Sequence, residues 1–325
     1  MNVSNLSQRL DAAARVDSVI EAKPSWQSQW LNAALRLLPI KKGMASAAAV
    51  QAHVRKRVLR PAPYGPGELG RDIRVTLKDV AGWPVYTSTC ASGEDTGRYV
   101  LFLHGGGFIN EIVRGHWRFI ADLTRHARVR CVVPIYPLMP RVTAKELVPA
   151  TGELLHKLVQ DVAPAKVTVI GNSAGAGLGV AAAQWLRDTG YPQPDGLVLI
   201  SPWVTTSMER EEQVALAAAD PLQDMPGIAE LARLYADDLD HAHPYVSPLN
   251  GDFHGLAPMI AFAGTLDLLY PDSIDLAAKA RAAGVPFELH LRQGQPHNYA
   301  GMPTPEGRQA RAIILRAAAQ GVMAS

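Results

Sequence analysis

Short apolar runs alternate with longer amphipathic stretches over most of this chain. The runs have the length of buried strands, and the stretches between them carry apolar residues at helical spacing. This alternation predicts a parallel sheet with helices on both faces, because each return between parallel strands needs a crossover. The predicted strands are Ile73–Leu77, Val85–Thr89, Tyr99–Leu103, Val129–Ile135, Val167–Ile170, Leu197–Ile200, Met259–Ala263 and Phe287–Leu291, and the predicted helices between them are His116–Ala127, Ala144–Val162, Ala174–Asp188, Ser273–Ala283 and Glu306–Ala319.

Two segments depart from this alternation and have helical patterns without a convincing strand. Before the first strand, Trp26–Leu38 and Ala47–Val58 have apolar residues at helical spacing, and we expect them to form a lid. Between Thr205 and Tyr245 the pattern predicts two further helices, around Glu211–Ala219 and Ile228–Ala236. We therefore expect N-terminal cap helices in residues 1–65, a core in 66–202 and 246–325, and a cap insertion in 203–245.

Composition and charge narrow the class of protein. The chain has 325 residues, of which 48% are hydrophobic, so it can bury a large core. A net charge of only +2 gives no general field for nucleic acid or anionic lipid, and neither is expected as a partner. Residues Met1–Ile20 lack the apolar core of a secretory signal, and no stretch reaches the length of a membrane span. Cytoplasmic residence is therefore the expectation, with Cys90 and Cys131 as free thiols.

A candidate nucleophile lies between one predicted strand and one predicted helix. Gly171-Asn-Ser-Ala-Gly175 joins the strand Val167–Ile170 to a helix of small residues, which is the setting that a Gly-x-Ser-x-Gly elbow requires. The helix N-terminus behind Ser173 favours developing negative charge. A glycine-rich turn needed only for packing is the alternative, but the strand and helix on either side favour a catalytic serine.

A second glycine motif follows the strand Tyr99–Leu103. In His104-Gly105-Gly106-Gly107 the backbone N–H groups are unshielded by side chains, as a site for a tetrahedral oxyanion requires. We assign the oxyanion donors to the N–H groups of Gly106, Gly107 and Ala174. We interpret His104 and Gly105 as residues that shape the loop, and His104 not as a catalytic base.

The base and the acid are expected at the ends of two late strands. His297 follows the strand Phe287–Leu291 in a loop, and Asp267 follows the strand Met259–Ala263. Asp220 is a rival for the acid, but it falls in the inserted helical segment with no strand to aim it. The order Ser173, Asp267, His297 is the order that an α/β-hydrolase fold requires. No motif for a metal or a cofactor is found, and we expect neither.

With these motifs in place, the chain resembles the hormone-sensitive-lipase-like (family IV) microbial esterases. His104-Gly-Gly-Gly107 and Gly171-x-Ser-Ala-Gly175 carry the resemblance, which covers nearly the whole chain. It implies an α/β-hydrolase fold with a mostly parallel eight-stranded sheet, a helical cap, no cofactor, and esters of short to medium acyl chains as substrates. The family often has an acidic residue where this chain has Asn172, and Asp-Pro-Leu where this chain has Asp267-Leu-Leu269.

The motifs predict a serine carboxylesterase that works through an acyl-enzyme intermediate. The same residues would serve a lactone, an amide or a carbamate, and a non-catalytic small-molecule receptor on the same fold is a further alternative. Specificity is expected to reside in the cap, in the helix with Trp26 and Trp30 and in the segment beginning at Trp203. The resemblance also allows a homodimer through the edge strand Phe287–Leu291.

Overall fold

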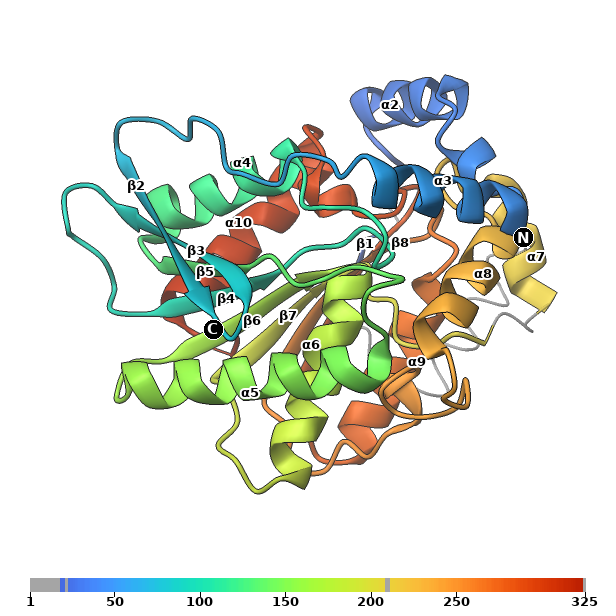
Figure 1. The fold of residues 1–325 in the computed structure, drawn as a ribbon. Coiled ribbons are helices and arrows are strands. Elements are labelled where there is room, and N and C mark those ends of the chain that lie inside the picture. Colours follow the sequence, from blue (N-terminus) through green and yellow to red (C-terminus); the bar gives the residue numbers. More distant parts are fainter. Residues whose placement is uncertain (1–17, 21–22, 208–210, 324–325) are drawn as a thin grey trace.

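A twisted sheet of nine strands runs through the centre of the molecule (Figure 1). The computed structural model describes residues 18–20, 23–207 and 211–323. The strand order is β1-β9-β8-β7-β6-β4-β5-β3-β2. Strands β2 and β3 pair with each other in antiparallel fashion, β3 is antiparallel to β5, and the remaining pairs are parallel. Most of Met1–Ile20, on which the prediction of location rests, lies outside the described residues.

The bounds of the elements agree with the predicted strands and helices to within three residues at either end. In chain order the elements are β1 (Ser18–Ile20), α2 (Trp26–Leu37), η1 (Lys41–Met44), α3 (Ala47–Leu59), β2 (Ile73–Val80), β3 (Trp83–Cys90), β4 (Tyr99–Leu103), α4 (Arg114–Asp122), η2 (Leu123–Ala127), β5 (Arg130–Pro134), α5 (Ala144–Val162), β6 (Val167–Asn172), α6 (Ala174–Asp188), β7 (Gly196–Ile200), α7 (Glu211–Ala219), α8 (Met225–Ala236), η3 (Pro248–Asn250), β8 (Met259–Gly264), α9 (Tyr270–Ala282), β9 (Phe287–Arg292), η4 (Tyr299–Gly301) and α10 (Pro305–Gln320).

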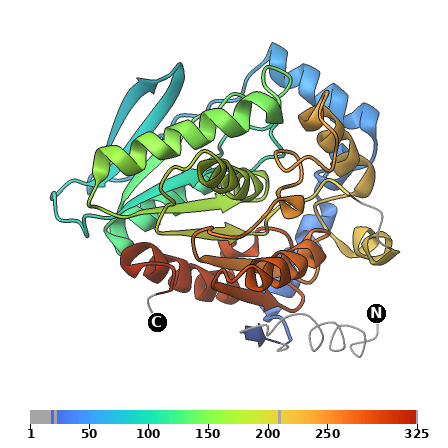
Figure 2. The same ribbon diagram turned by 90° about the horizontal axis from the view of Figure 1, so that it is seen from below.

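The sheet separates two hydrophobic cores. Alternate residues of a strand point to opposite faces, so in β4 the side chains of Leu101 and Leu103 join one core and those of Val100 and Phe102 join the other. The first core includes residues of α5, α6 and α9, and the second includes residues of α4 and α10. Figures 1 and 2 show these two helical layers on either side of the sheet. The sheet with helices on both faces that the alternation predicts, and the α/β-hydrolase fold that the family resemblance implies, are therefore confirmed.

Strands β2 to β9 are the eight strands of the predicted sheet, and β1 is a short ninth strand that the pattern did not indicate. It pairs in parallel with β9, with Ser18 opposite His290 and Ile20 opposite Arg292. This is the edge that the family resemblance allowed as a dimer contact. Part of that edge is therefore paired within the chain.

The N-terminal helices pack against the helices of the inserted segment. Gln51 of α3 donates a hydrogen bond of 2.9 Å from its Nε2 to Oε1 of Glu230 in α8, and Gly227 of α8 lies close to the backbone of Met44. Figure 1 shows α2, α3, α7 and α8 gathered on one side of the sheet; we call this group of helices the cap. The boundaries at residues 65, 202 and 245 stay predictions. Each helix in the described part of the chain is too short or too polar to span a lipid bilayer.

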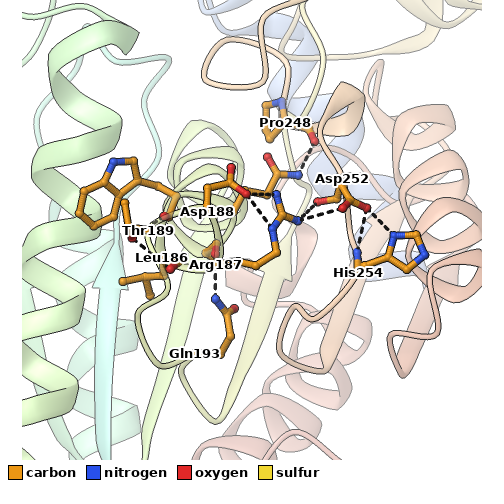
Figure 3. Close-up of polar contacts among 11 residues, drawn as sticks. Leu186, Arg187, Asp188, Thr189, Gln193, Pro248, Asp252 and His254 are labelled. Carbon is orange, nitrogen blue, oxygen red and sulfur yellow. Dashed lines mark hydrogen bonds and ion pairs between the residues drawn. The ribbon is translucent and has the colours of Figure 1, made fainter.

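A polar network fixes the C-terminal end of α6, far along the helix from its first residue (Figure 3). The guanidinium of Arg187 donates to Asp188 Oδ1 at 2.8 Å and also to the main-chain carbonyl of Asp252. His254 Nδ1 lies 2.6 Å from Asp252 Oδ1. Gln184 donates to the carbonyl of Pro248 at 2.9 Å. Helix α6 is therefore held at this end by the loop that precedes β8.

Candidate active site

Ser173 occupies the turn between β6 and α6, in a strained backbone conformation. Its φ is +53° and its ψ is −123°, a combination that costs energy for any residue with a side chain. The turn is possible because its neighbours are glycines. A Cβ at Gly171 would lie 2.5 Å from the carbonyl oxygen of Gly175, and a Cβ at Gly175 would overlap the carbonyl oxygen of Leu103 in β4. The turn therefore presents Ser173 at the end of the sheet, with the N-terminus of α6 behind it.

The structure brings the predicted nucleophile, base and acid into one hydrogen-bonded chain. Ser173 Oγ lies 2.9 Å from His297 Nε2, and His297 Nδ1 lies 2.8 Å from Asp267 Oδ2. Asp267 is fully buried and His297 nearly so, whereas Ser173 is half-buried. Since Nδ1 donates to the carboxylate, Nε2 is left to accept the hydroxyl proton of Ser173. The arrangement can therefore activate an oxygen nucleophile.

The loops that carry the acid and the base are bonded directly to each other. The amide of Thr265 donates to the carbonyl of Arg292 at 3.0 Å, and the amide of Leu266 donates to the carbonyl of Gln295 at 2.9 Å. The amide of Gly294 donates in return to the hydroxyl of Thr265 at 2.9 Å. Backbone contacts between adjacent strands β8 and β9 thus continue into their loops. They fix the distance between Asp267 and His297.

The environment of His297 favours its protonated form. Burial by itself would lower the pKa of this imidazole, but the charge and the hydrogen bond of Asp267, together with the charge of Asp220, more than offset burial. The net effect raises the pKa of His297 above its ordinary value of 6.5. An imidazole with a raised pKa is a stronger base toward a serine hydroxyl.

Asp220, the rival acid, lies beside the acid loop without bonding to His297. Its Oδ2 accepts from the amide of Leu268 at 2.8 Å, and its Oδ1 accepts from the amides of Leu222 and Gln223 at 2.7 and 3.0 Å. Burial, followed by the charge of Asp267, raises the pKa of Asp220 to about 6, although these backbone bonds oppose the shift. Asp220 is therefore a second buried carboxylate beneath the base, contributed by the cap.

The Gly105–Gly107 segment forms a loop next to Ser173. The φ values of Gly106 and Gly107 are +131° and +62°, which other residues rarely adopt. Within the part of the chain that the structure describes, the amides of Gly106, Gly107 and Ala174 donate to no protein acceptor. A Cβ at Gly105 would lie 3.1 Å from the Cβ of Ser173, so this loop passes directly over the nucleophile. The three amides assigned to an oxyanion hole thus belong to segments that meet at Ser173.

Asn172 holds this loop in place. Its Oδ1 accepts a hydrogen bond of 2.7 Å from the buried amide of Gly105, and its Nδ2 lies 3.3 Å from Nε2 of His116. Burial, and then the neighbouring His104, lower the pKa of His116 to about 3, so this imidazole is neutral, and its Nδ1 accepts a hydrogen bond of 3.1 Å from the amide of Val113. A neutral asparagine thus holds the glycine loop through its side-chain oxygen.

His104 has the structural surroundings expected of a loop-shaping residue. It is fully buried, and its ring stacks on Tyr136 with 4.3 Å between the ring centroids. The Tyr136 hydroxyl donates to the main-chain carbonyl of His104. Burial lowers the pKa of His104 to about 4, so it is neutral at physiological pH. Neither Tyr136 nor His116 has a sequence motif that would have identified it.

Two hollows lie near the loop. A small one of about 10 Å³ is lined by Trp203 together with Phe108, Tyr235 and Tyr245. The rings of Phe108 and Tyr235 are stacked, with 4.0 Å between their centroids. A larger one of about 420 Å³ lies between α3, the turn joining β2 and β3, and the segment after β5. Trp26 and Trp30 line neither hollow.

A family model described as the alpha/beta hydrolase fold matches residues 100–301, more than half of the chain. Among curated proteins, an acetyl-hydrolase of Streptomyces hygroscopicus is 34% identical over 220 residues, which cover 66% of this chain and 73% of that protein. A triacylglycerol lipase of Mycobacterium tuberculosis is 32% identical over 240 residues, which cover 74% of this chain. The chain spans only about half of that lipase, 49% of its length.

Solved structures show the same relationship. An esterase/lipase from an uncultured bacterium superimposes with a TM-score of 0.76 at 28% identity, covering 92% of this chain and all of that one. An esterase of the bacterial hormone-sensitive lipase family superimposes with a TM-score of 0.71 at 28% identity, covering 85% of this chain and 98% of that one. The chain therefore belongs to the α/β-hydrolase fold family, among the hormone-sensitive-lipase-like esterases.

Proposed function

We propose that this chain hydrolyses carboxylic esters of short to medium acyl chains, with Ser173 as nucleophile, His297 as base and Asp267 as the residue that orients the base. The observation that carries the proposal is the continuous chain of hydrogen bonds from Ser173 Oγ through His297 to Asp267. The esterase, lipase and acetyl-hydrolase names of its relatives support the same bond type.

The first half of the reaction forms an acyl-enzyme. His297 Nε2 takes the proton of the Ser173 hydroxyl while Oγ attacks the ester carbonyl, which becomes a tetrahedral oxyanion. The amides of Gly106, Gly107 and Ala174 donate to that oxyanion. The imidazolium then gives its proton to the alcohol oxygen as the carbon–oxygen bond breaks, and the alcohol leaves.

The second half repeats this cycle with water. His297 takes a proton from the water as its oxygen attacks the acyl carbonyl, and the returned proton restores the Ser173 hydroxyl when the acid leaves. Throughout, the carboxylate of Asp267 orients His297 and stabilises the imidazolium. Its burial and its bonds to the amide of Leu269 (2.9 Å) and to Nε2 of Gln223 (3.3 Å) hold it in position.

We assign the acyl side of the site to the aromatic group of Phe108, Trp203 and Tyr235. Phe108 directly follows the glycine loop, and Trp203 packs 6.0 Å from it, between ring centroids. The hollow between these rings has room for about one water molecule, so these side chains would have to move apart to admit an acyl group. The cap boundaries, cytoplasmic residence and a homodimer remain predictions from the sequence.

A panel of substrates tests this function. Initial rates should be compared for p-nitrophenyl esters from acetate to laurate, for lactones and for anilides, with the Ser173→Ala protein as blank. We expect the highest kcat/KM on an ester of short or medium chain. A higher kcat/KM on a lactone or an anilide would show that the enzyme prefers that bond to an open-chain ester, and binding of these compounds without turnover would indicate a receptor.

A further inference from the structure

Helix α2 exposes its apolar side. Trp26 is 73% exposed, Trp30 69% and Leu37 87%. At about 100° per residue these three side chains fall within roughly 40° of one another around the helix axis, so they form one stripe, and exposed Ala33 falls on the same stripe. Figure 1 shows α2 at the periphery of the cap, beyond α3. A stripe with two exposed tryptophans is unusual on a surface that meets only water.

The two fully buried side chains of α2 are polar, and Leu31 and Leu35 beside them are half-buried. Ser28 and Asn32 are the buried residues of this helix. The Ser28 hydroxyl donates to Glu306 at 2.7 Å and lies 3.2 Å from Gln295, and Asn32 Nδ2 donates to the carbonyl of Gly294 at 3.0 Å. A helix that packs on a core normally has the reverse arrangement. These bonds therefore fix the orientation of α2, and the outward stripe is not a loosely held core face.

The charge of the same region is strongly positive. Residues 23–67 contain eight Lys and Arg residues and no Asp or Glu. Because the whole chain is +2 and this segment is +8, the remainder carries −6. The overall balance hides this asymmetry. The eight cations are Lys23, Arg36, Lys41, Lys42, Arg55, Lys56, Arg57 and Arg60.

From these features we propose that the stripe of Trp26, Trp30 and Leu37 docks on an anionic lipid–water interface, with the surrounding cations contacting the lipid headgroups. Tryptophan is favoured at the level of the headgroups, and cations near an apolar face add an attraction to anionic lipid. Apolar burial and headgroup attraction together give the two signals that stable peripheral binding needs.

A second copy of the chain fits the stripe less well. A twofold contact would place the same surface on both partners, so two copies of the basic segment 23–67 would face each other. Like charges brought together in this way oppose association. Anionic lipid has the opposite sign, and its attraction adds to the burial of the stripe.

The docking surface is linked to the inserted part of the cap. Arg36 of α2 donates to the carbonyl of Ala219 at 2.7 Å, and Lys41 of η1 donates to the carbonyl of Asp220 at 2.8 Å. Asp220 in turn holds the amide of Leu268 beside the acid. Two hydrogen bonds, Lys41 to Asp220 and Leu268 to Asp220, thus connect the segment after α2 with the residue next to Asp267.

Binding to vesicles tests this inference independently of catalysis, because the Ser173→Ala protein can be used throughout. The full chain is mixed with phosphatidylcholine vesicles without or with about 30 mol% phosphatidylglycerol and separated by flotation. Three further variants are made in the same background. Trp26→Ser/Trp30→Ser removes the stripe, Lys23→Glu/Lys42→Glu reverses two exposed charges, and Leu77→Ser/Met323→Ser removes two exposed apolar residues elsewhere as the control.

We expect the parent protein to partition at least about tenfold more strongly onto the anionic vesicles, with tryptophan emission shifted to the blue. The stripe variant and the charge variant should each lose about tenfold or more, and the control should match the parent. Raising the salt from about 0.1 to 0.5 M should weaken binding. Equal binding to both vesicle types, or no binding, would overturn the inference. So would a dimer that light scattering finds in the parent but not in the stripe variant.

Discussion

Replacing Asp220 with asparagine removes one charge from the buried pair beneath His297. Because Oδ1 of Asp220 accepts two amides and Oδ2 accepts the amide of Leu268, the carbonyl of an asparagine can serve only one side. Its NH₂ group then meets a donor on the other. Losing one buried hydrogen bond to a carboxylate costs about 1.5–3 kcal/mol.

Removing the charge of Asp220 should stabilise the folded protein at a pH where the wild-type carboxyl is ionised, in contrast to the lost hydrogen bond. The folded protein raises the pKa of Asp220 from 3.8 to about 6, so between these values the folded state binds the proton more tightly than the unfolded state. Stability therefore falls as pH rises through this window. From pH 4.5 to 7.5 the loss is about 2 kcal/mol, at roughly 1.4 kcal/mol per unit. Asp220→Asn lacks this loss, so its deficit relative to wild type should shrink by about 2 kcal/mol.

Urea unfolding at the two pH values measures this change, and the pH profile of kcat/KM adds a second readout. Since the charge of Asp220 helps to raise the pKa of His297, the acid limb of Asp220→Asn should move to lower pH. Asp224→Asn is the matched control, because Asp224 lies in the same segment but only caps α8. A stability deficit that is the same at both pH values, with an unmoved acid limb, would refute this account of Asp220.

Three further predictions concern the base, the elbow and the glycine loop. In wild type, kcat/KM should fall with decreasing pH through a midpoint above 6.5, because only neutral His297 accepts a proton. Asp267→Asn should lower this midpoint and should reduce kcat by roughly 10³–10⁴-fold in steady-state assays. Gly175→Ala should lower the free energy of unfolding measured in urea by at least about 2 kcal/mol, because its Cβ overlaps β4. Gly115→Ala, whose Cβ meets open space, should leave it unchanged, and equal effects of the two substitutions would show that the contact with β4 does not matter. Asn172→Ala should lower kcat about tenfold with little change in KM. Asn172→Asp keeps the acceptor for the Gly105 amide and should recover most of this loss; no recovery would show that this hydrogen bond does not hold the loop.

The sequence was sufficient for those parts of the site that depend on strand ends. Ser173, Asp267 and His297 each follow a strand, and the ends of neighbouring parallel strands meet at one edge of the sheet, so their order along the chain predicts their proximity. The same reasoning located the glycine loop. Apolar periodicity likewise predicted eight strands, because each is a buried run.

The sequence did not predict the features that depend on how distant segments pack together. Asp220 has no strand to aim it, and only the docking of the cap places it beside Asp267. The partner of Asn172 is a backbone amide, which has no sequence signature. Periodicity predicted α2 correctly but not which side faces inward, because that side is fixed by bonds from Ser28 and Asn32 to residues far along the chain.

Formation of a covalent bond at Ser173 would identify this residue as the nucleophile. A fluorophosphonate should react in a single stoichiometric step, the modified peptide should contain Ser173, and ester hydrolysis should be lost in parallel with labelling. The Ser173→Ala protein should show neither labelling nor hydrolysis. Labelling of a different residue, or hydrolysis by Ser173→Ala at the wild-type rate, would show that Ser173 is not the nucleophile.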